Sequence, residues 1–175
     1  TDEDAIVLGA ATVSGTYGIT AGGAVTDTGT QEIAGVTTIS ASGQDVTLNT
    51  ATNNFADEVR ITGAAVTLVD EDTIDLGAST VSGTYTVTAT TGGITDSGTQ
   101  EITGVTTLAA GSGNDITLDI STNNFAAAVV ITSGRNVAIT DEDAIVLGAA
   151  TVSGTYGITA GGAITDTGTQ EITGV

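Results

Sequence analysis

Carboxylates are the main reactive groups of this sequence, and they recur in a fixed pattern. An Asp-Glu-Asp tripeptide occurs at positions 2–4, 70–72 and 141–143. Carboxylates this close repel one another, and a hard, oxygen-preferring cation such as Ca²⁺ would relieve the repulsion. The sequence therefore gives six candidate Ca²⁺ ligands: Asp2, Asp4, Asp70, Asp72, Asp141 and Asp143. The alternative is a solvated acidic loop that keeps the protein soluble.

Most other catalytic chemistry is excluded by composition. The 175 residues include no His, Cys, Lys, Met, Trp or Pro. Without His or Cys there is no Ser-His-Asp triad, thiol nucleophile, ordinary zinc site or disulfide. Paired carboxylates can hydrolyse glycosides, but these acids recur in each repeat instead of marking one cleft. We therefore expect a protein that is not an enzyme, with Ca²⁺ as the one candidate cofactor.

The charge balance limits the partners. Arg60 and Arg135 are the only basic residues against 21 Asp and Glu, so the net charge is −19. Nucleic-acid binding needs basic groups that displace counterions, so nucleic acid is excluded as a partner. The sequence has no apolar run long enough to cross a bilayer, and membrane insertion is not expected.

The chain is a repeat. Residues 1–36 match residues 140–175 except at Val25/Ile164 and Ala34/Thr173, and another copy begins at Asp70. We expect one continuous segment over 1–175, with units at 1–69, 70–140 and, in part, 141–175. The second copy, from Asp70 to Asp141, is slightly longer than the first, from Asp2 to Asp70.

Three single-residue insertions lengthen the second copy. They fall in short stretches of small and polar residues: 21–23 against 89–93, 42–43 against 111–113, and 63–64 against 133–135. A one-residue slip would turn every side chain of a strand to the other face, whereas turns tolerate insertions. The insertions therefore predict three turns that divide the unit into three segments of roughly 20 to 27 residues.

Short strands lie between these turns. Stretches such as 66–68, 94–96 and 116–118 alternate β-branched apolar residues with Thr or another polar residue, a period of two that indicates β-structure. An antiparallel sandwich gives each strand a unique environment, whereas stacked coils repeat it, so the near-identical copies favour a β-solenoid. The motif at 52–55, repeated at 122–125, predicts a corner with one inward Asn and a core Phe. Stacked threonines could also form an ice-binding face, but coils of unequal length argue against it.

The chain resembles the β-helical repeat regions of giant bacterial surface proteins, namely the filamentous-haemagglutinin-like, two-partner-secreted and autotransporter-type adhesins. The resemblance covers the whole chain and lies in three runs of residues: 113–118, 78–83 and 92–98. It implies an all-β, right-handed parallel β-helix with about three coils per repeat unit, located outside the cell or on its surface.

These observations lead to one expected function and one alternative. We expect a non-catalytic structural segment of an extracellular fibre or adhesin stalk; the alternative is a calcium-dependent repeat module. Because no polar capping coil is evident at either end, we also expect self-association or continuation into a longer fibre. Contacts with a cell surface or carbohydrate are expected elsewhere in such a protein.

Overall fold

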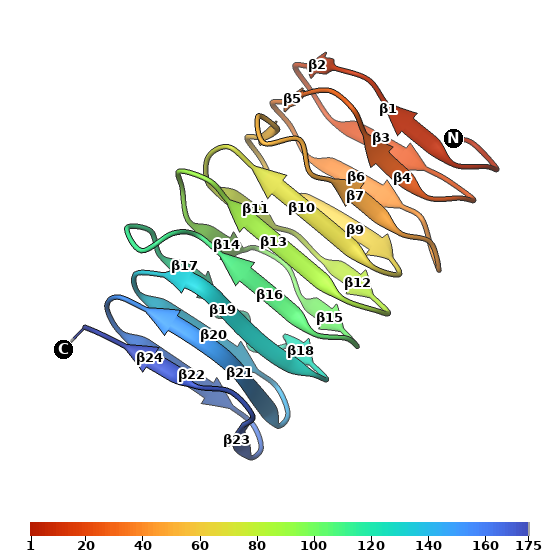
Figure 1. The fold of residues 1–175 in the computed structure, drawn as a ribbon. Helices are drawn as coiled ribbons and strands as arrows, with labels where there is room; N and C mark the ends of the chain where they lie inside the picture. Colours follow the sequence, from red (N-terminus) through yellow and green to blue (C-terminus); the bar gives the residue numbers. More distant parts are fainter. Residues whose placement is uncertain (175) are drawn as a thin grey trace.

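The protein is a column of stacked parallel β-strands. Its structure, a computed structural model, describes residues 1–174, and this part of the chain contains strands and turns but no helix. The chain winds through about eight turns, and its two termini lie at opposite ends of the column (Figure 1). The predicted all-β solenoid is therefore confirmed. Val175, the last residue of the third predicted unit, lies outside the described residues.

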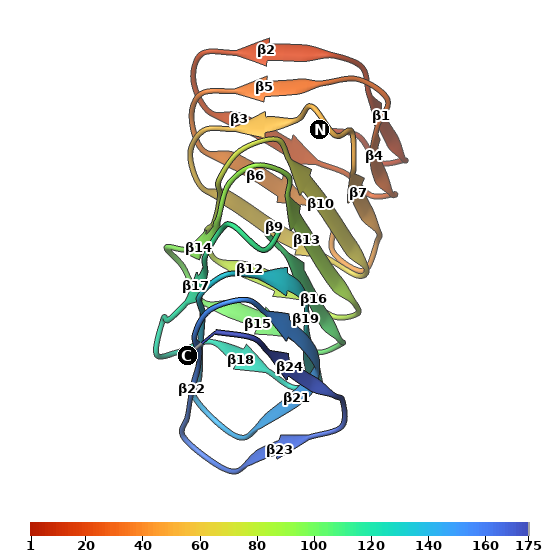
Figure 2. The same cartoon turned by 60° about the vertical axis from the view of Figure 1, so that its left-hand side comes forward.

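The 24 strands of residues 1–174 form three sheets (Figure 2). The ten-stranded sheet contains β1 (Ile6–Leu8), β4 (Val25–Asp27), β7 (Val46–Leu48), β10 (Val66–Asp70), β13 (Tyr85–Ala89), β16 (Thr106–Ala109), β19 (Ala128–Gly134), β21 (Ile145–Val152), β23 (Ile164–Asp166) and β24 (Gln170–Ile172). The eleven-stranded sheet contains β3 (Tyr17–Thr20), β6 (Thr37–Ser40), β9 (Val59–Gly63), β11 (Ile74–Leu76), β12 (Ser79–Val81), β14 (Ile94–Asp96), β15 (Gln100–Ile102), β17 (Ile116–Leu118), β18 (Asn124–Phe125), β20 (Val137–Asp141) and β22 (Tyr156–Ala160). The smallest sheet contains β2 (Ala11–Val13), β5 (Gln31–Ile33) and β8 (Asn54–Phe55).

The core is a narrow interior lined by alternate residues of each strand. In β10, Val66 and Leu68 are buried while Thr67 between them is partly exposed. Neighbouring turns pair in parallel register, so Leu68 lies between Leu48 and Val87. Like side chains thus stack on like side chains along the column, which is the packing that the period of two in the sequence predicts.

One repeat unit contains three turns and one further strand. The strands β1, β4, β7 and β10 pair in succession, so every third strand returns to the same stack. Ten strands, β1 to β10, precede the strand β11 that is equivalent to β1. Equivalent strands therefore move one position around the column with each repeat. The longest predicted segment exceeds one coil, because Val66 at its start already pairs with Tyr85 near its end.

Two of the three insertions lie in turns, and the third does not. The turns at 90–92 and 111–113 hold the first two inserted residues, as predicted. The turn predicted at 133–135 lies at 135–136, because β19 continues to Gly134, and the third inserted residue is in the strand. There Leu108 pairs with Ile131 and Ala109 with Ser133, so one residue of β19 is skipped in a β-bulge. A bulge accommodates an extra residue without reversing the rest of the strand, because the added residue is left unpaired.

The stacking is interrupted once in each repeat, at the predicted Asn-Phe corner. β8 ends the three-stranded sheet, and the next strand that should cover it, β11, pairs with β9 instead, at Leu76 and Val59. In the second repeat, β18 is the last strand on its path. We call these two places the first and second interruptions, between β8 and β11 and between β18 and β21.

Candidate functional site

The three acidic tripeptides share one local geometry. The first aspartate of each accepts a hydrogen bond at Oδ1 from the backbone N–H two residues on: Asp4 to Asp2 at 2.9 Å, Asp72 to Asp70 at 2.7 Å and Asp143 to Asp141 at 2.8 Å. This bond forms the tight turn that aspartate favours. Three of the six predicted Ca²⁺ ligands, the first aspartate of each tripeptide, therefore form the turn. The other three lie on the same turns, two residues further along the chain.

The tripeptides lie at different positions around the column. They precede β1, β11 and the first half of β21, which are the first, second and third strands of their turns. Carboxylates of successive repeats therefore do not stack into a shared cluster. Within residues 1–174, no three acidic side chains converge where a metal ion could be held. Calcium binding stays a prediction that a binding experiment must test.

Asp70 and Asp141 are buried and occupy the two interruptions. Oδ2 of Asp70 accepts the backbone N–H of Phe55 at 2.8 Å, and Oδ2 of Asp141 accepts that of Phe125 at the same distance. The exposed fractions of Asp70 and Asp141 are 0% and 2%. Each carboxylate therefore takes the place of a carbonyl that the interrupted sheet would otherwise present to the phenylalanine.

Burial changes the acidity of Asp70. Desolvation raises the pKa of its carboxyl to about 6, against the opposing effect of the Phe55 and Asp72 N–H groups; the nearby Asp72 and Glu71 carboxylates raise it further. The folded protein therefore binds a proton here that the unfolded chain releases at lower pH.

Acidification should stabilise the protein between pH 7.5 and pH 5. The stabilisation from a raised pKa is complete below the unfolded pKa near 4 and is lost as pH rises through about 6. For Asp70 this corresponds to about 1 kcal/mol more stability at pH 5 than at pH 7.5. Urea unfolding at the two pH values measures the difference. In Asp70→Asn it should shrink, and an equal dependence in both proteins would contradict this assignment.

A second buried polar group supports the corner before each interruption. Asn53 Nδ2 donates to Asp27 Oδ2 at 2.6 Å, and Asn53 Oδ1 accepts the N–H of Gln31 at 2.9 Å. Asp27 also accepts the backbone N–H groups of Asn49 and Thr50. Asn53 is fully buried, so the predicted inward Asn is confirmed, as is the core position of Phe55.

The second repeat builds the same group from equivalent residues. Asn123 donates to Asp96 at 2.6 Å and accepts from the Gln100 N–H at 2.9 Å. Burial raises the pKa of Asp96 above its usual range. Asp27 and Asp96, the last residues of β4 and β14, thus each tie two neighbouring coils together. The sequence contains a sign of this group, because its Asp, Gln and Asn residues recur together in both copies.

The surface has two equivalent shallow hollows, of about 340 and 200 Å³. One lies over β2, β5 and β8 beside Glu32 and Asn54, and the other over β12, β15 and β18 beside Glu101 and Asn124. Their linings are hydroxyl, methyl, carboxylate and amide groups, without an aromatic or basic side chain. The hollows thus offer hydrogen-bonding groups but no positive charge that would bind an anionic ligand.

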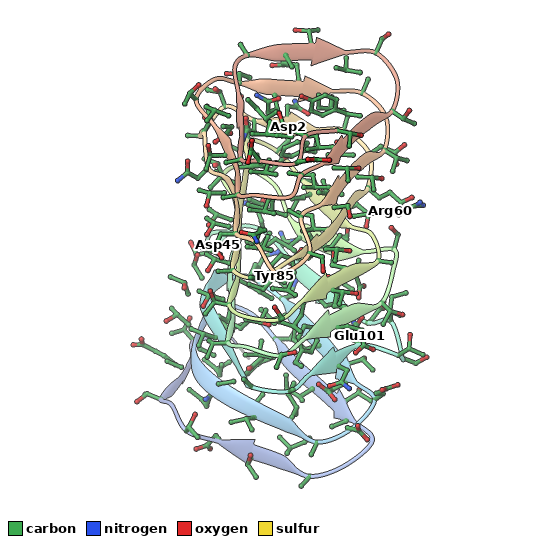
Figure 3. All side chains as sticks on the ribbon, turned by 90° about the vertical axis from the view of Figure 1, so that its right-hand side faces the viewer. Asp2, Asp45, Arg60, Tyr85 and Glu101 are labelled. Atoms are coloured by element: carbon green, nitrogen blue, oxygen red, sulfur yellow. The ribbon has the colours of Figure 1, made fainter. Side chains whose placement is uncertain are left out.

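Both arginines are paired with acids. Arg60 contacts Glu58 and projects from the column, whereas Tyr85 lies inside it (Figure 3). Arg135 binds Asp115 through two hydrogen bonds of 2.8 Å, and this guanidinium holds the pKa of Asp115 at about 2.

Residues 1–174 contain no helix with the length and apolarity that crossing a membrane requires.

Comparison with known proteins gives one match. A family model described as repeats of unknown function (DUF5649) matches residues 1–62, 63–132 and 134–175. Neither the curated proteins nor the solved structures gave a match. The second and third matched units begin slightly before the predicted ones, at positions 63 and 134 of β9 and β19.

Proposed function

The chain belongs to the family of repeats of unknown function (DUF5649), whose units match nearly all of it, and we propose that it is a non-catalytic structural segment of an extracellular bacterial fibre or adhesin stalk. The observation that supports this proposal is the strand pairing that runs from turn to turn between the two ends of the column. Such a column spans distance with backbone hydrogen bonds along its axis, and adding repeats lengthens it without changing its width.

Two further properties support a spacer. The acidic residues are spread around the column by the one-strand shift per repeat, so the charge of −19 is not concentrated in one binding site. A high net charge also keeps a long repetitive chain soluble. Self-association, or continuation into a longer fibre built from the same unit, is part of the proposal.

Arrays of the repeat test the spacer role. At about 4.8 Å per turn, a unit of three turns and one strand should add roughly 16 Å of length. Arrays with five and ten copies of residues 70–140 should appear by electron microscopy as rods whose length rises by this increment at constant width. Rods that fold back, or particles that widen with copy number, would contradict the proposal.

Antibody labelling tests the cellular location. An antibody raised against the purified chain should label intact cells that produce the natural protein. Labelling that needs lysed cells would rule out the surface location and leave the spacer geometry untouched.

The second candidate function is a calcium-dependent module. The observation that favours it is the exposed carboxylate of Asp72. Its Oδ2 accepts a hydrogen bond of 3.4 Å from the side-chain amide of Asn54. A Ca²⁺ ion at this turn would have Asp72 and Glu71 as ligands, since both oxygens of Asp70 already accept backbone N–H groups.

Melting with and without Ca²⁺ separates the two functions. A module with a Kd near 10 µM should gain about 2.7 kcal/mol at 1 mM Ca²⁺, a hundredfold excess over Kd. Asp72→Asn with Asp143→Asn should remove the gain. An unchanged melting temperature at millimolar Ca²⁺, with Mg²⁺ as the ionic-strength control, would eliminate the calcium function.

A further inference from the structure

At each interruption one strand, β8 or β18, has no partner strand on the far side within residues 1–174. β10 and β13 pair along five residues, from Val66 with Tyr85 to Asp70 with Ala89. At the first interruption β9 meets β11 at a single pair and β12 at two. At the second, β18 has no partner strand beyond β15 in the described part of the chain, and β19 and β21 pair at four positions interrupted by two register shifts.

Side-chain and loop bonds replace the missing strand pairs. Besides the Asp70 carboxylate on the Phe55 N–H, the Glu71 N–H donates to the Asn53 carbonyl at 2.7 Å. The second interruption has the equivalent bond from Glu142 to Asn123, also at 2.7 Å. A buried carboxylate without a cation beside it recovers little of its desolvation cost, so these bonds hold two turns together less strongly than a sheet does.

In a stacked column each turn contacts only its neighbours. Partly unfolded states therefore form by cutting the column at its weakest interfaces, and the residues between two cuts open together. We propose that the column opens in blocks of one repeat, bounded by the two interruptions: residues 1–62, 63–133 and 134–174. These block limits follow the family units, which begin at 63 and 134, the last residues of β9 and β19.

This inference goes beyond the spacer role, because it concerns how the column opens and not what it spans. It implies that a long array of these repeats yields one unit at a time. A turn inside a block would stay paired until its whole block opens.

Hydrogen exchange followed by mass spectrometry over urea concentrations below the unfolding midpoint tests the proposal. We expect three groups of amides that share an opening within each group, with the two terminal blocks exchanging at least tenfold faster than 63–133. Exchange that steps separately at every turn of the column would overturn the proposal, as would one uniform group for the whole chain.

Two pairs of variants localise the effect. Asp141→Ala removes the bond to Phe125 and should speed exchange of 134–174 about tenfold, with 63–133 unchanged. Asp70→Ala should do the same for 1–62. The matched controls are Asp143→Ala, two residues from Asp141, and Glu71→Ala, next to Asp70; both acids are exposed. Equal acceleration by the controls, or acceleration of all three blocks, would count against the proposal. Circular dichroism below the transition shows whether each variant keeps its strands.

Discussion

Gly98→Ala should destabilise the protein by about 3 kcal/mol, the upper part of the range for overpacking. A Cβ at position 98 would lie 2.2 Å from the Ala78 backbone nitrogen and 2.8 Å from the Gly77 carbonyl carbon. Both atoms belong to the backbone of the adjacent turn, so no side-chain rotation relieves the contact. The two turns would have to separate, at the expense of their hydrogen bonds. The urea unfolding midpoint measures the loss.

Gly113→Ala is the matched control. Its Cβ would meet nothing within 4 Å, and its backbone is not in the left-handed region. Stability should stay unchanged or rise by up to about 1 kcal/mol, because alanine restricts the unfolded chain. Equal destabilisation by both substitutions would show that the turns are not packed as closely as the structure has them.

Phe125→Ala should cost about 3–5 kcal/mol, the range for removing a buried phenylalanine. Its side chain is 1% exposed and lies in the core at the second interruption, where β18 has no further partner strand within residues 1–174. Phe55→Ala, at the equivalent place, should cost a similar amount. Denaturant unfolding measures both.

Phe125→Leu serves as the control for Phe125→Ala. It keeps most of the apolar volume and should cost less than about 1.5 kcal/mol. A loss below about 1 kcal/mol for the alanine variant would contradict the core position of this ring.

The architecture was predictable because its signals are local or repeated. The alternation in 66–68 predicts the buried Val66 and Leu68 of β10, and the near-identity of the copies favours stacked coils. The tenth strand of each unit was not predictable, because alternation identifies strands but does not say how many complete a turn. The bulge at Thr132 was missed for a related reason: a small, polar stretch such as 133–135 is typical of a turn and also of the irregular end of a strand.

The candidate site was predicted only in part. The acidic tripeptides stand out as repeated charges, but their sequence does not show that Asp70 and Asp141 point inward to a phenylalanine N–H. That contact joins residues 15 or 16 positions apart across the interruption, and the interruption follows from the count of strands per turn. The Asp27 and Asn53 pair likewise joins residues 26 positions apart on neighbouring coils.

Engineered cysteine pairs test the parallel winding most directly, since the natural chain has no cysteine to compete. Thr67 and Thr86 are partners in register on β10 and β13, so their Cα atoms should be about 4.8 Å apart. Thr67→Cys with Thr86→Cys should therefore form an intramolecular disulfide under mild oxidation. The pair at Thr67 and Thr88 is displaced by two residues, beyond the roughly 7 Å that a disulfide spans, and should stay reduced. Efficient cross-linking of the displaced pair, or none of the pair in register, would contradict the column.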